Sequence, residues 1–520
     1  MCFSTINAQN VSFDWLKSLG GPNNDVLRGV CIDSSGNIYA TGSFIGTTSI
    51  ANQNFVSNGA TDIIVNKFDS IGNLLWAKSL GSVSFDYAFD IDCEPNGNFY
   101  ITGGFRQTLN FSPSISLISS GEMDLFTAKF DTLGNCIWAK SATGYSSEYG
   151  NEIVTTANGN VAVIGNTQGT IVFTTDTLFH MDSTDLFLVK YDSNGNEIWC
   201  KGLPGLGNAG GRAISTDDFE NTIIAGSFAG NIYIDTVIFN STTVPNNDIY
   251  ISKFSPTGTL IWAKQFGGTG DDYARGIDAD ANGNIYVSGV FSNSVNFDGI
   301  TLAANGSSDI FLMKLDSNGN IIWIKQIGNL GAEEGCEIEA LPSGDIFITG
   351  GFSQTIILGS NNYTALGMRD VFIAKIDSSG NIIWAKTAGS AMDDVNYAIG
   401  LNMYNEDVCT VGTYSGSFTD GLNSITSLGG VDSYISKIKS SLTTSINDII
   451  NSSTTIAIHP NPSNTIINVD CKKGFQIYSS TGQLVKQSSQ ATTQINISDL
   501  PTGLYILKTE NQQGRFIKTE

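Results

Sequence analysis

Residues 272–325 read DYARGIDADANGNIYVSGVFSNSVNFDGITLAANGSSDIFLMKLDSNGNIIWIK, and this stretch decides the fold. It contains four apolar runs of strand length: Gly276 to Ala279, Ile285 to Val290, Ile310 to Leu315 and Ile321 to Lys325. The first two runs are joined around Asn282-Gly283-Asn284 and the last two by residues 316–320, where glycine can take the positive φ of a tight turn. The stretch therefore predicts two hairpins that form a four-stranded antiparallel meander.

The chain repeats this unit. Its seven tryptophans recur every 61 to 63 residues, each followed two positions later by lysine: Trp15, Trp76, Trp138, Trp199, Trp262, Trp323 and Trp384. A constant period of this length indicates one structural unit copied along the chain. A longer, polar and variable connection separates the second and third runs of each unit.

The two ends of the repeat region complement each other. The chain begins with a lone fourth strand, Phe13 to Lys17, and the last unit stops after its third strand, Tyr434 to Ile438. Four-stranded sheets repeated radially are the blades of a β-propeller, and pairing of these two fragments removes the exposed edges of a linear array. We therefore predict an all-β protein in which residues 10–440 form a seven-bladed β-propeller closed by the N-terminal strand. A solenoid is the rival architecture, but a solenoid needs polar caps rather than complementary half-units.

The unit resembles the bacterial seven-bladed propeller repeat family. The residues that carry the resemblance are Trp262-Ala263-Lys264, Asp271-Asp272, the Asp280 to Asn284 turn and Tyr286-Val287-Ser288-Gly289. The resemblance implies the fold over residues 12 to 440 and implies no activity.

Composition excludes several classes of partner. The chain has 520 residues, and its 49 acidic residues against 26 basic ones give a net charge of −23, which repels phosphate backbones and anionic membranes. No apolar run is long enough for a membrane helix, so we expect no transmembrane segment. We expect no nucleic-acid partner and a monomeric protein.

Residues 1–9 are interpreted as the remnant of a signal peptide, with a short disordered tail as the alternative. The cysteines keep no common position in the repeats, which favours small buried side chains, although a bridge between neighbouring strands remains open.

A ligand-binding face is predicted at the rim of the central channel. Acids precede the first strand of five units at Asp25, Asp86, Glu148, Asp272 and Glu333, and the other two units have alanine or valine there. Three positions further on lie Arg28, Arg212 and Arg275, replaced elsewhere by Phe89, Asn151, Cys336 and Ala398. Arginines on such a face can grip a carboxylate or sulfate. The alternative is a water-filled channel with balanced charges.

No cofactor and no metal site are predicted. The Asp-x-x-Gly-Asn turns resemble the Asp-box turns of sialidase propellers, which are structural, and they lack the alternating carboxylates of a calcium loop. Calcium at these turns remains an alternative.

Catalytic residues are not identified. The only histidines, His180 and His459, lie in no recognisable catalytic motif, so the protein is expected not to be an enzyme. A glycosidase or lyase with two carboxylates remains open, because sequence cannot place the acids in space.

Residues 441–453 form a polar stretch typical of a linker, and residues 454–520 contain about seven short strands. These strands predict a small Ig-like β-sandwich.

The tail resembles the type A C-terminal sorting domain of type IX secretion. The resemblance rests on Pro460, Asn461, Pro462, Tyr478, Gly482, Gly503, Tyr505 and Lys518. It implies passage through the outer membrane, recognition by the secretion machinery, proteolytic removal and, in many members, attachment to surface lipopolysaccharide. The alternative is an ordinary carbohydrate-binding or Ig-like module.

Together these features predict a secreted or outer-membrane surface-attached propeller that acts as a binding or scaffold module for an extracellular protein or glycan. A polysaccharide-active enzyme with paired carboxylates on the channel face, and a purely architectural surface protein, are the two alternatives.

Overall fold

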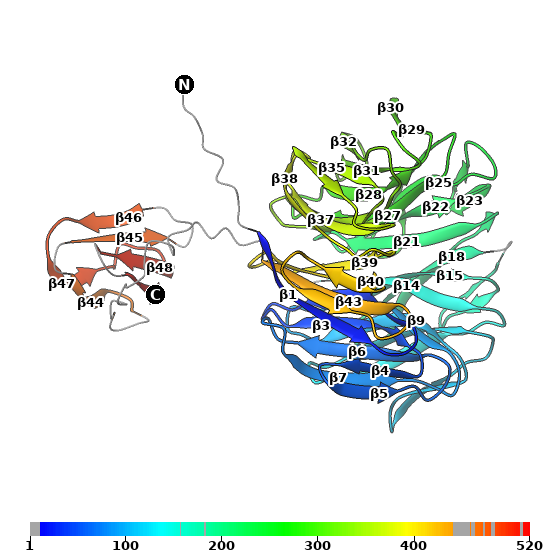
Figure 1. Cartoon of the computed structure of the whole chain (residues 1–520), viewed down its shortest axis with the longest axis horizontal. Coiled ribbons are helices and arrows are strands. Elements are labelled where there is room, and N and C mark those ends of the chain that lie inside the picture. The colour runs from blue at the N-terminus through cyan, green and yellow to red at the C-terminus, as the bar shows by residue number, and fades with distance from the viewer. Residues whose placement is uncertain are drawn as a thin grey trace. The chain divides into compact units, whose positions relative to one another are not determined.

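The computed structural model describes residues 11–156, 158–180, 184–439, 458, 463–471, 474–479, 484–509 and 513–519. Their regular secondary structure is entirely β-strand (Figure 1). Within these residues there is accordingly no helix that could cross a membrane. The chain divides into a large unit, Val11–Ser441, and a smaller one that takes in Leu442–Glu520. The predicted N-terminal remnant, residues 1–9, and the predicted linker, residues 441–453, lie outside the described residues.

The large unit contains seven antiparallel sheets, each built on four long strands, and two of these sheets are extended to six strands by a short hairpin (Figure 1). The first three sheets are β2(Asp25–Ile32)-β3(Ile38–Phe44)-β6(Asp62–Phe68)-β7(Leu74–Leu80), β8(Asp86–Cys93)-β9(Phe99–Phe105)-β12(Asp124–Phe130)-β13(Cys136–Ala142) and β14(Glu148–Thr155)-β15(Val161–Thr167)-β18(Asp185–Tyr191)-β19(Glu197–Leu203). The next three are β21(Ala209–Thr216)-β22(Thr222–Phe228)-β25(Asp248–Phe254)-β26(Leu260–Gly268), β27(Asp272–Ala279)-β28(Ile285–Phe291)-β31(Asp309–Leu315)-β32(Ile321–Ile327) and β33(Glu333–Ala340)-β34(Ile346–Phe352)-β37(Asp370–Ile376)-β38(Ile382–Ala388). The seventh is β39(Val395–Leu401)-β40(Asp407–Tyr414)-β43(Asp432–Lys439)-β1(Ser12–Gly20).

The seventh sheet joins the two ends of the large unit. Its fourth strand is β1, which pairs antiparallel with β43, with Leu16 opposite Ser436 and Leu19 opposite Ser433. The predicted pairing of the N-terminal strand with the last third strand is therefore confirmed. This pairing leaves neither segment as an open edge.

The turns explain why each unit folds into hairpins. Gly283 and Gly319 have φ of 76° and 82°, the left-handed conformation that the sequence predicted there. At the first of these turns, Asp280 Oδ1 accepts hydrogen bonds from the backbone amides of Asn282 and Asn284, and its Oδ2 accepts from the Asn284 side chain. The carboxylate thus closes the turn, and both of its oxygens are already hydrogen-bonded.

The connection between the second and third strands is more ordered than predicted. In every sheet it contains a further short hairpin, which the sequence analysis described only as a polar connection. The hairpins are β4(Thr47–Ile50)-β5(Gln53–Val56), β10(Thr108–Ser112)-β11(Ile115–Ile118), β16(Ile171–Val172)-β17(Thr177–Leu178), β23(Asn231–Ile234)-β24(Val237–Asn240), β29(Ser294–Phe297)-β30(Ile300–Ala303), β35(Thr355–Leu358)-β36(Asn361–Thr364) and β41(Ser417–Thr419)-β42(Ser424–Thr426). A two-residue strand, β20(Gly205–Leu206), also pairs with β23.

The hydrophobic core lies between the sheets. It consists of seven clusters, each formed by two consecutive sheets, and one of them joins the seventh sheet to the first through residues such as Ile435 and Leu27. Both faces of each sheet are therefore covered, and every side chain of a third strand such as β31 is buried.

The repeated tryptophans fasten each sheet to the next. Trp138 Nε1 donates to the carbonyl of Ser193, and Trp199 Nε1 to that of Pro256, at 3.1 and 2.9 Å. A Cβ on Gly195 or Gly258, in the same turns, would lie within 3.0 Å of the tryptophan ring. Lysines of the third strands act similarly, since Lys67 Nζ donates to the Thr132 carbonyl of the next sheet at 3.2 Å.

The smaller unit contains two antiparallel sheets. One pairs β44(Ile466–Cys471) with β47(Thr492–Asn496), and the other has the order β46(Leu484–Ser488)-β45(Phe475–Ser479)-β48(Gly503–Lys508)-β49(Gln513–Lys518). One cluster that includes Ile467, Ile495, Ile477, Leu507 and Phe516 draws on both sheets. The two sheets thus share a core.

Candidate functional site

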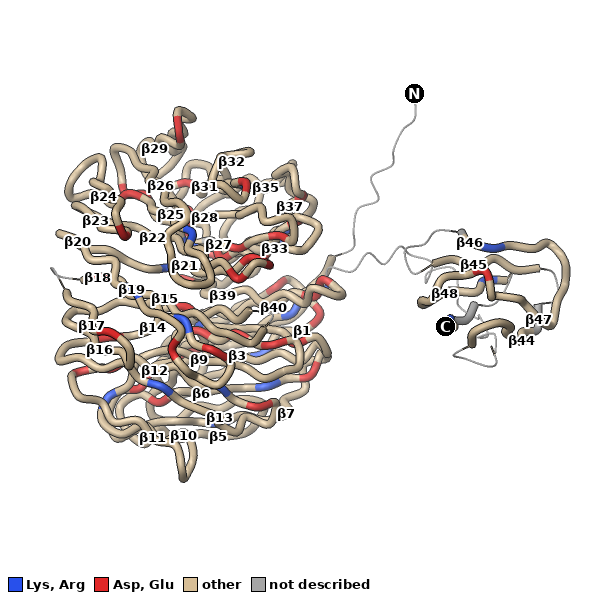
Figure 2. The backbone as a smooth tube through the Cα atoms, turned by 180° about the vertical axis from the view of Figure 1, so that it is seen from behind, with Lys and Arg blue, Asp and Glu red and all other residues tan. Residues whose placement is uncertain are grey.

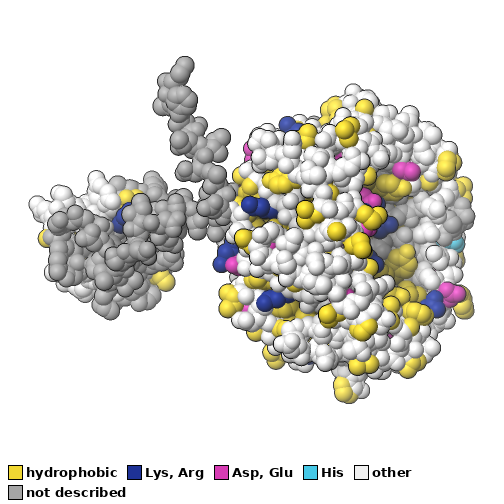
Figure 3. Space-filling view, viewed as in Figure 1, with side chains coloured by type: hydrophobic (Ala, Val, Ile, Leu, Met, Phe, Trp, Pro, Cys, Tyr) yellow, Lys and Arg dark blue, Asp and Glu magenta, His cyan; other side chains and the backbone are white. Residues whose placement is uncertain are grey.

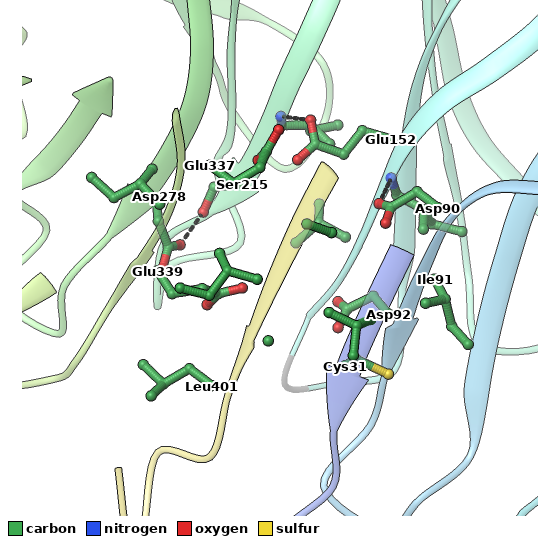
Figure 4. Close-up of a pocket in the computed structure, with 18 of the residues that line it drawn as sticks. Cys31, Asp90, Ile91, Asp92, Glu152, Ser215, Asp278, Glu337, Glu339 and Leu401 are labelled. Carbon is green, nitrogen blue, oxygen red and sulfur yellow. Dashed lines mark hydrogen bonds between the residues drawn. The ribbon is translucent and has the colours of Figure 1, made fainter. Parts of the chain in front are cut away.

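The first strands of all seven sheets line one cavity of about 710 Å³ (Figure 4). These strands are β2, β8, β14, β21, β27, β33 and β39. Charged residues are sparse along the backbone (Figure 2) and on the face of the large unit shown in Figure 3, whereas many residues that line this cavity are charged. A cavity of this size with converging polar groups is the usual setting of a ligand site.

Arg28 lies between two aromatic rings in the cavity wall. Its guanidinium carbon is 5.5 Å from the ring centre of Phe89 on β8 and 4.8 Å from that of Tyr397 on β39. Each distance falls within the range of a cation–π interaction. We call these three side chains, which come from the first, second and seventh sheets, the arginine shelf.

Arg212 and Arg275 also line the cavity, so the structure brings the three predicted arginines together. The Arg275 guanidinium lies 5.2 Å from the ring centre of Tyr273. Burial raises the pKa of Glu337, and the charges of both arginines, which lie near that carboxyl, offset part of the rise.

Ten of the described acidic residues line the same cavity, and six of them are labelled in Figure 4: Asp90, Asp92, Glu152, Asp278, Glu337 and Glu339. Several of them accept hydrogen bonds from backbone amides of a neighbouring first strand. Asp90 accepts from Ile153 N at 2.9 Å and Glu152 from Ile214 N at 2.9 Å. One edge of each first strand is not paired with another strand, so its backbone amides lack strand partners. These carboxylates accept hydrogen bonds from some of those amides.

The same six acids are hard to ionise together. Burial, followed by neighbouring carboxylates, raises the pKa of Glu337 and Asp90 to about 8 and that of Asp278 to about 6. Burial and then Asp278 raise the pKa of Glu339 well above its usual range. A cavity with such groups can bind cations and polar neutral ligands, and it contains carboxyls able to exchange protons near neutral pH.

The five predicted acids do not line the cavity, and the prediction of one shared face is wrong for them. Asp25, Asp86, Glu148, Asp272 and Glu333 are 0% exposed. Each begins a first strand, and its backbone amide bonds a carbonyl of the preceding sheet, as Asp272 N does with Asn247 O at 2.9 Å. Asp25 and Asp272 stand three positions before Arg28 and Arg275, and an odd spacing along a strand reverses the direction of the side chain. The acids therefore point between the sheets.

The seventh unit has an acid that the comparison of the repeat units in the sequence did not identify. Asp394 N bonds Arg369 O at 3.0 Å, in the same way as the other five acids bond the preceding sheet. Val395, which was aligned with those acids, stands one residue later, and Tyr397 rather than Ala398 occupies the position of Arg28. A shift of one residue in a strand exchanges the two faces.

A group of possible soft metal ligands lies in the cavity wall. One ligand atom each from Cys31, Asp92 and Cys93 lies within 4.8 Å of the others. Burial raises the pKa of both thiols, so at neutral pH they are protonated and poor ligands. Cys31 and Cys93 are both free thiols in the structure.

The sequence analysis missed the six cavity acids and the aromatic part of the arginine shelf. A signal existed in the alternation of Asp90 with Asp92 and of Glu337 with Glu339, which puts both acids of a pair on one face of a strand. That signal alone does not say which face meets the cavity.

In the tail, four predicted sorting residues are described. Gly503 pairs with Lys518 and Tyr505 with Phe516 across β48 and β49. Tyr505 donates to the Pro501 carbonyl at 2.7 Å, and Tyr478 lies on β45. Pro460, Asn461, Pro462 and Gly482 lie outside the described residues.

Comparison with known proteins agrees with both parts of the chain. The family described as a secretion system C-terminal sorting domain matches residues 457–519. The family described as a beta-propeller repeat matches residues 261–290.

Two curated proteins are similar to part of the chain. An uncharacterized WD repeat-containing protein, L264, of Acanthamoeba polyphaga mimivirus is 25% identical over 371 residues, which is 62% of this chain and 24% of that protein. The regulatory protein FlaEY of Caulobacter vibrioides is 24% identical over 139 residues, or 26% of this chain and 14% of that protein. The chain thus spans no more than about a quarter of the length of either relative.

Solved structures are similar at a low level. A protein of unknown function from Dyadobacter fermentans has 8% identity and a TM-score of 0.39, over 68% of this chain and 94% of that one. The WD40 domain of Pan2 from Neurospora crassa has 10% identity and a TM-score of 0.29, over 67% of this chain and 88% of that one. The two family matches show that the chain combines a beta-propeller repeat with a C-terminal sorting domain of the type IX secretion system, which indicates secretion and cell-surface attachment.

Proposed function

We propose that the protein is a seven-bladed β-propeller that binds an extracellular glycan or protein in its central cavity and is exported by its C-terminal domain. The observation that carries this proposal is the convergence of the arginine shelf, Arg212 and Arg275 on one cavity whose lining includes the six acids labelled in Figure 4. Seven sheets with cores between neighbours support the number of blades.

The two units have separate roles in this proposal. Residues 10–440 are the propeller, residues 441–453 the linker and residues 454–520 an Ig-like sandwich that the type IX machinery recognises. The two sheets that share a core in the smaller unit support a sandwich. Removal of this domain after export would leave the propeller free or attached to the surface.

A glycan suits the lining better than a polyanion does. Carboxylates accept hydrogen bonds from sugar hydroxyls, arginines donate to sugar oxygens, and the rings of Phe89 and Tyr397 offer apolar surface. The six acids disfavour a highly sulfated ligand deep in the cavity.

The test is binding of the purified full chain to an array of glycans and polysaccharides, with calcium and with chelator. We expect a specific ligand whose affinity falls at least tenfold in the Arg28→Ala and Arg275→Ala variants. Arg106→Ala is the matched control, because Arg106 pairs with Glu122 away from the cavity. Equal losses in all three variants, or no ligand on the array, would contradict a glycan-binding cavity.

A polysaccharide-active enzyme is the second candidate function. It is favoured by the six acids in one cavity, among them carboxyls with pKa values of about 6 and 8 that suit proton exchange near neutral pH. Incubating the protein with each bound polysaccharide and measuring new reducing ends tests it. Product formation that disappears in Glu337→Gln would support an enzyme, and unaltered polysaccharide would leave binding as the function.

A purely architectural surface protein is the third candidate, and it predicts a different result from binding or catalysis. Substitutions in the cavity would then change neither ligand binding nor the properties of the cell surface.

A further inference from the structure

Buried carboxylates face each other between consecutive sheets. Each third strand begins with Asp, and in six places the next first strand begins near it with a second acid. In four of these pairs both members have oxygens without a hydrogen-bond partner of ordinary geometry. We call these the open pairs: Asp432 with Asp25, Asp124 with Glu148, Asp248 with Asp272, and Asp309 with Glu333.

The two oxygens of each third-strand aspartate have different roles. Oδ2 accepts a loop amide, as Asp248 does from Thr242 N and Asp124 from Ser120 N, both at 2.8 Å. Oδ1 is buried without a partner in all four open pairs. Oδ1 of Asp62 and Asp370, in the two pairs that are not open, is also without a partner, so the second acid is what distinguishes the open pairs.

The second acid of each open pair is less satisfied still. Asp272 and Glu333 are 0% exposed, and neither oxygen of either carboxylate has a partner. The amides of Gly268 and Ser292 lie close enough to Asp272, and that of Asn329 close enough to Glu333, to lower the pKa of these carboxyls, but outside the geometry of a hydrogen bond. Burial, and then the facing aspartate, nevertheless raises the pKa of both acids to about 8. Leaving a buried charge without a partner is costly.

In the pair of Asp309 and Glu333, the two carboxylates converge on one point. A Cβ on Gly328 would lie 2.7 Å from Asp309 Oδ1 and 2.8 Å from Glu333 Oε2. Glycine thus leaves room between them that any other residue would fill. Gly267 has the corresponding position against Asp248.

The fourth sheet has no second acid, and the residue found beside the aspartate there indicates that the open pairs lack a positive charge. The first strand β21 begins with Ala209, and there Asp185 Oδ2 lies 3.2 Å from Nδ1 of His180. Where the second carboxylate is absent, a side chain able to carry positive charge stands beside the aspartate. Among the described residues, no lysine, arginine or histidine forms an ion pair with either member of an open pair.

We propose that each open pair binds one calcium ion between consecutive sheets. Calcium takes carboxylate, hydroxyl and carbonyl oxygens in a flexible geometry, and its charge offsets both carboxylates. The Asp432–Asp25 pair has the fullest donor set, since Thr48 Oγ1 lies beside Asp25 and is also buried without a partner. These sites are distinct from the Asp-x-x-Gly-Asn turns, where the Asp280 oxygens are already hydrogen-bonded. The proposal does not depend on the ligand of the cavity.

The other two pairs, Asp62 with Asp86 and Asp370 with Asp394, serve as controls within the same chain, and we call them the closed pairs. Asp86 accepts from Ser82 N and Arg106 N, and Asp394 accepts from the amide and hydroxyl of Ser390. Their second acids therefore have partners on both oxygens. We expect no calcium at these pairs.

The test measures bound calcium in the full chain. The protein is unfolded with chelator, refolded with either calcium or magnesium, dialysed and analysed by atomic absorption. We expect four calcium ions per chain, no retained magnesium, and a melting temperature higher in calcium than in chelator. The Asp309→Asn/Glu333→Gln variant should retain three ions, whereas Asp370→Asn/Asp394→Asn should retain four.

Wild-type protein keeps the test decisive if a variant fails to fold. No retained calcium and one melting temperature under all conditions would overturn the proposal and indicate carboxyls that share protons. Equal calcium counts in both double variants would also overturn it, because the ions would then lie elsewhere.

Discussion

The guanidinium carbon of Arg28, in the first sheet, lies 4.8 Å from the centre of the Tyr397 ring, in the seventh. This contact connects the first and last units across the junction where the chain closes on itself. A cation–π interaction contributes about 0.5–2 kcal/mol, depending on how far the cation is desolvated.

Substitution of Tyr397 tests this relationship. Tyr397→Leu should lower the free energy of unfolding by about 1 kcal/mol and weaken ligand binding at the arginine shelf, because the guanidinium loses one of its two rings. Thermal unfolding and ligand titration measure the two effects. Tyr404→Leu is the control, since Tyr404 also lines the cavity but has no cation over its ring among the described residues.

Closure by the N-terminal strand predicts a large effect of small changes in β1. Leu19 is 0% exposed in the cluster between the seventh and first sheets, so Leu19→Ala should cost about 2–5 kcal/mol. Deletion of residues 10–19 should destabilise the protein further, because it exposes the edge of β43. Chemical denaturation measures both, with deletion of residues 1–9 as the control. Unchanged unfolding of the longer deletion would contradict closure by β1.

The tryptophan hydrogen bonds can be tested with a matched pair. Trp138 and Trp384 are both 8% exposed, but only Trp138 Nε1 has a hydrogen-bond acceptor, the Ser193 carbonyl. Trp138→Phe should therefore cost about 1 kcal/mol more than Trp384→Phe, beyond the loss of ring contact that both share. Equal melting temperatures for the two variants would show that ring packing alone joins the sheets.

The cavity acids predict how stability depends on pH. Glu337 has its folded pKa raised to about 8, so the folded state holds a proton that the unfolded state has lost. Stability without ligand should then fall as the pH rises from about 4.5 to 8, and be restored below that range. Glu337→Gln should flatten this dependence, with Glu334→Gln as the control on the same strand. An unchanged slope would mean that Glu337 is charged when the protein is folded.

The sorting domain predicts a block in export when it is removed. A chain that lacks residues 454–520 should accumulate in the periplasm, because the secretion machinery no longer recognises it. Cell fractionation and surface labelling measure this. Surface display of the truncated chain at the normal level would refute the role of the tail.

Sequence by itself determined the repeat, the four strands of each unit, the pairing of β1 with β43 and the sorting domain. Local patterns in the sequence predict these features: glycine at positive φ in the turns, continuous apolar third strands, and half-units at the two ends that complete each other. Each can be read within a stretch of about one unit, or by counting units.

Tertiary structure alone decided which charged residues meet. Asp90, Glu152 and Glu337 come from three sheets and converge only because the first strands surround one cavity. Asp25 and Asp272, three residues from arginines on the cavity wall, point away from it and face aspartates of the preceding sheet. The physical reason is that successive side chains on a strand alternate between faces, so one bulge or one residue of shift, as at Asp394, decides whether a charge meets the cavity or the core.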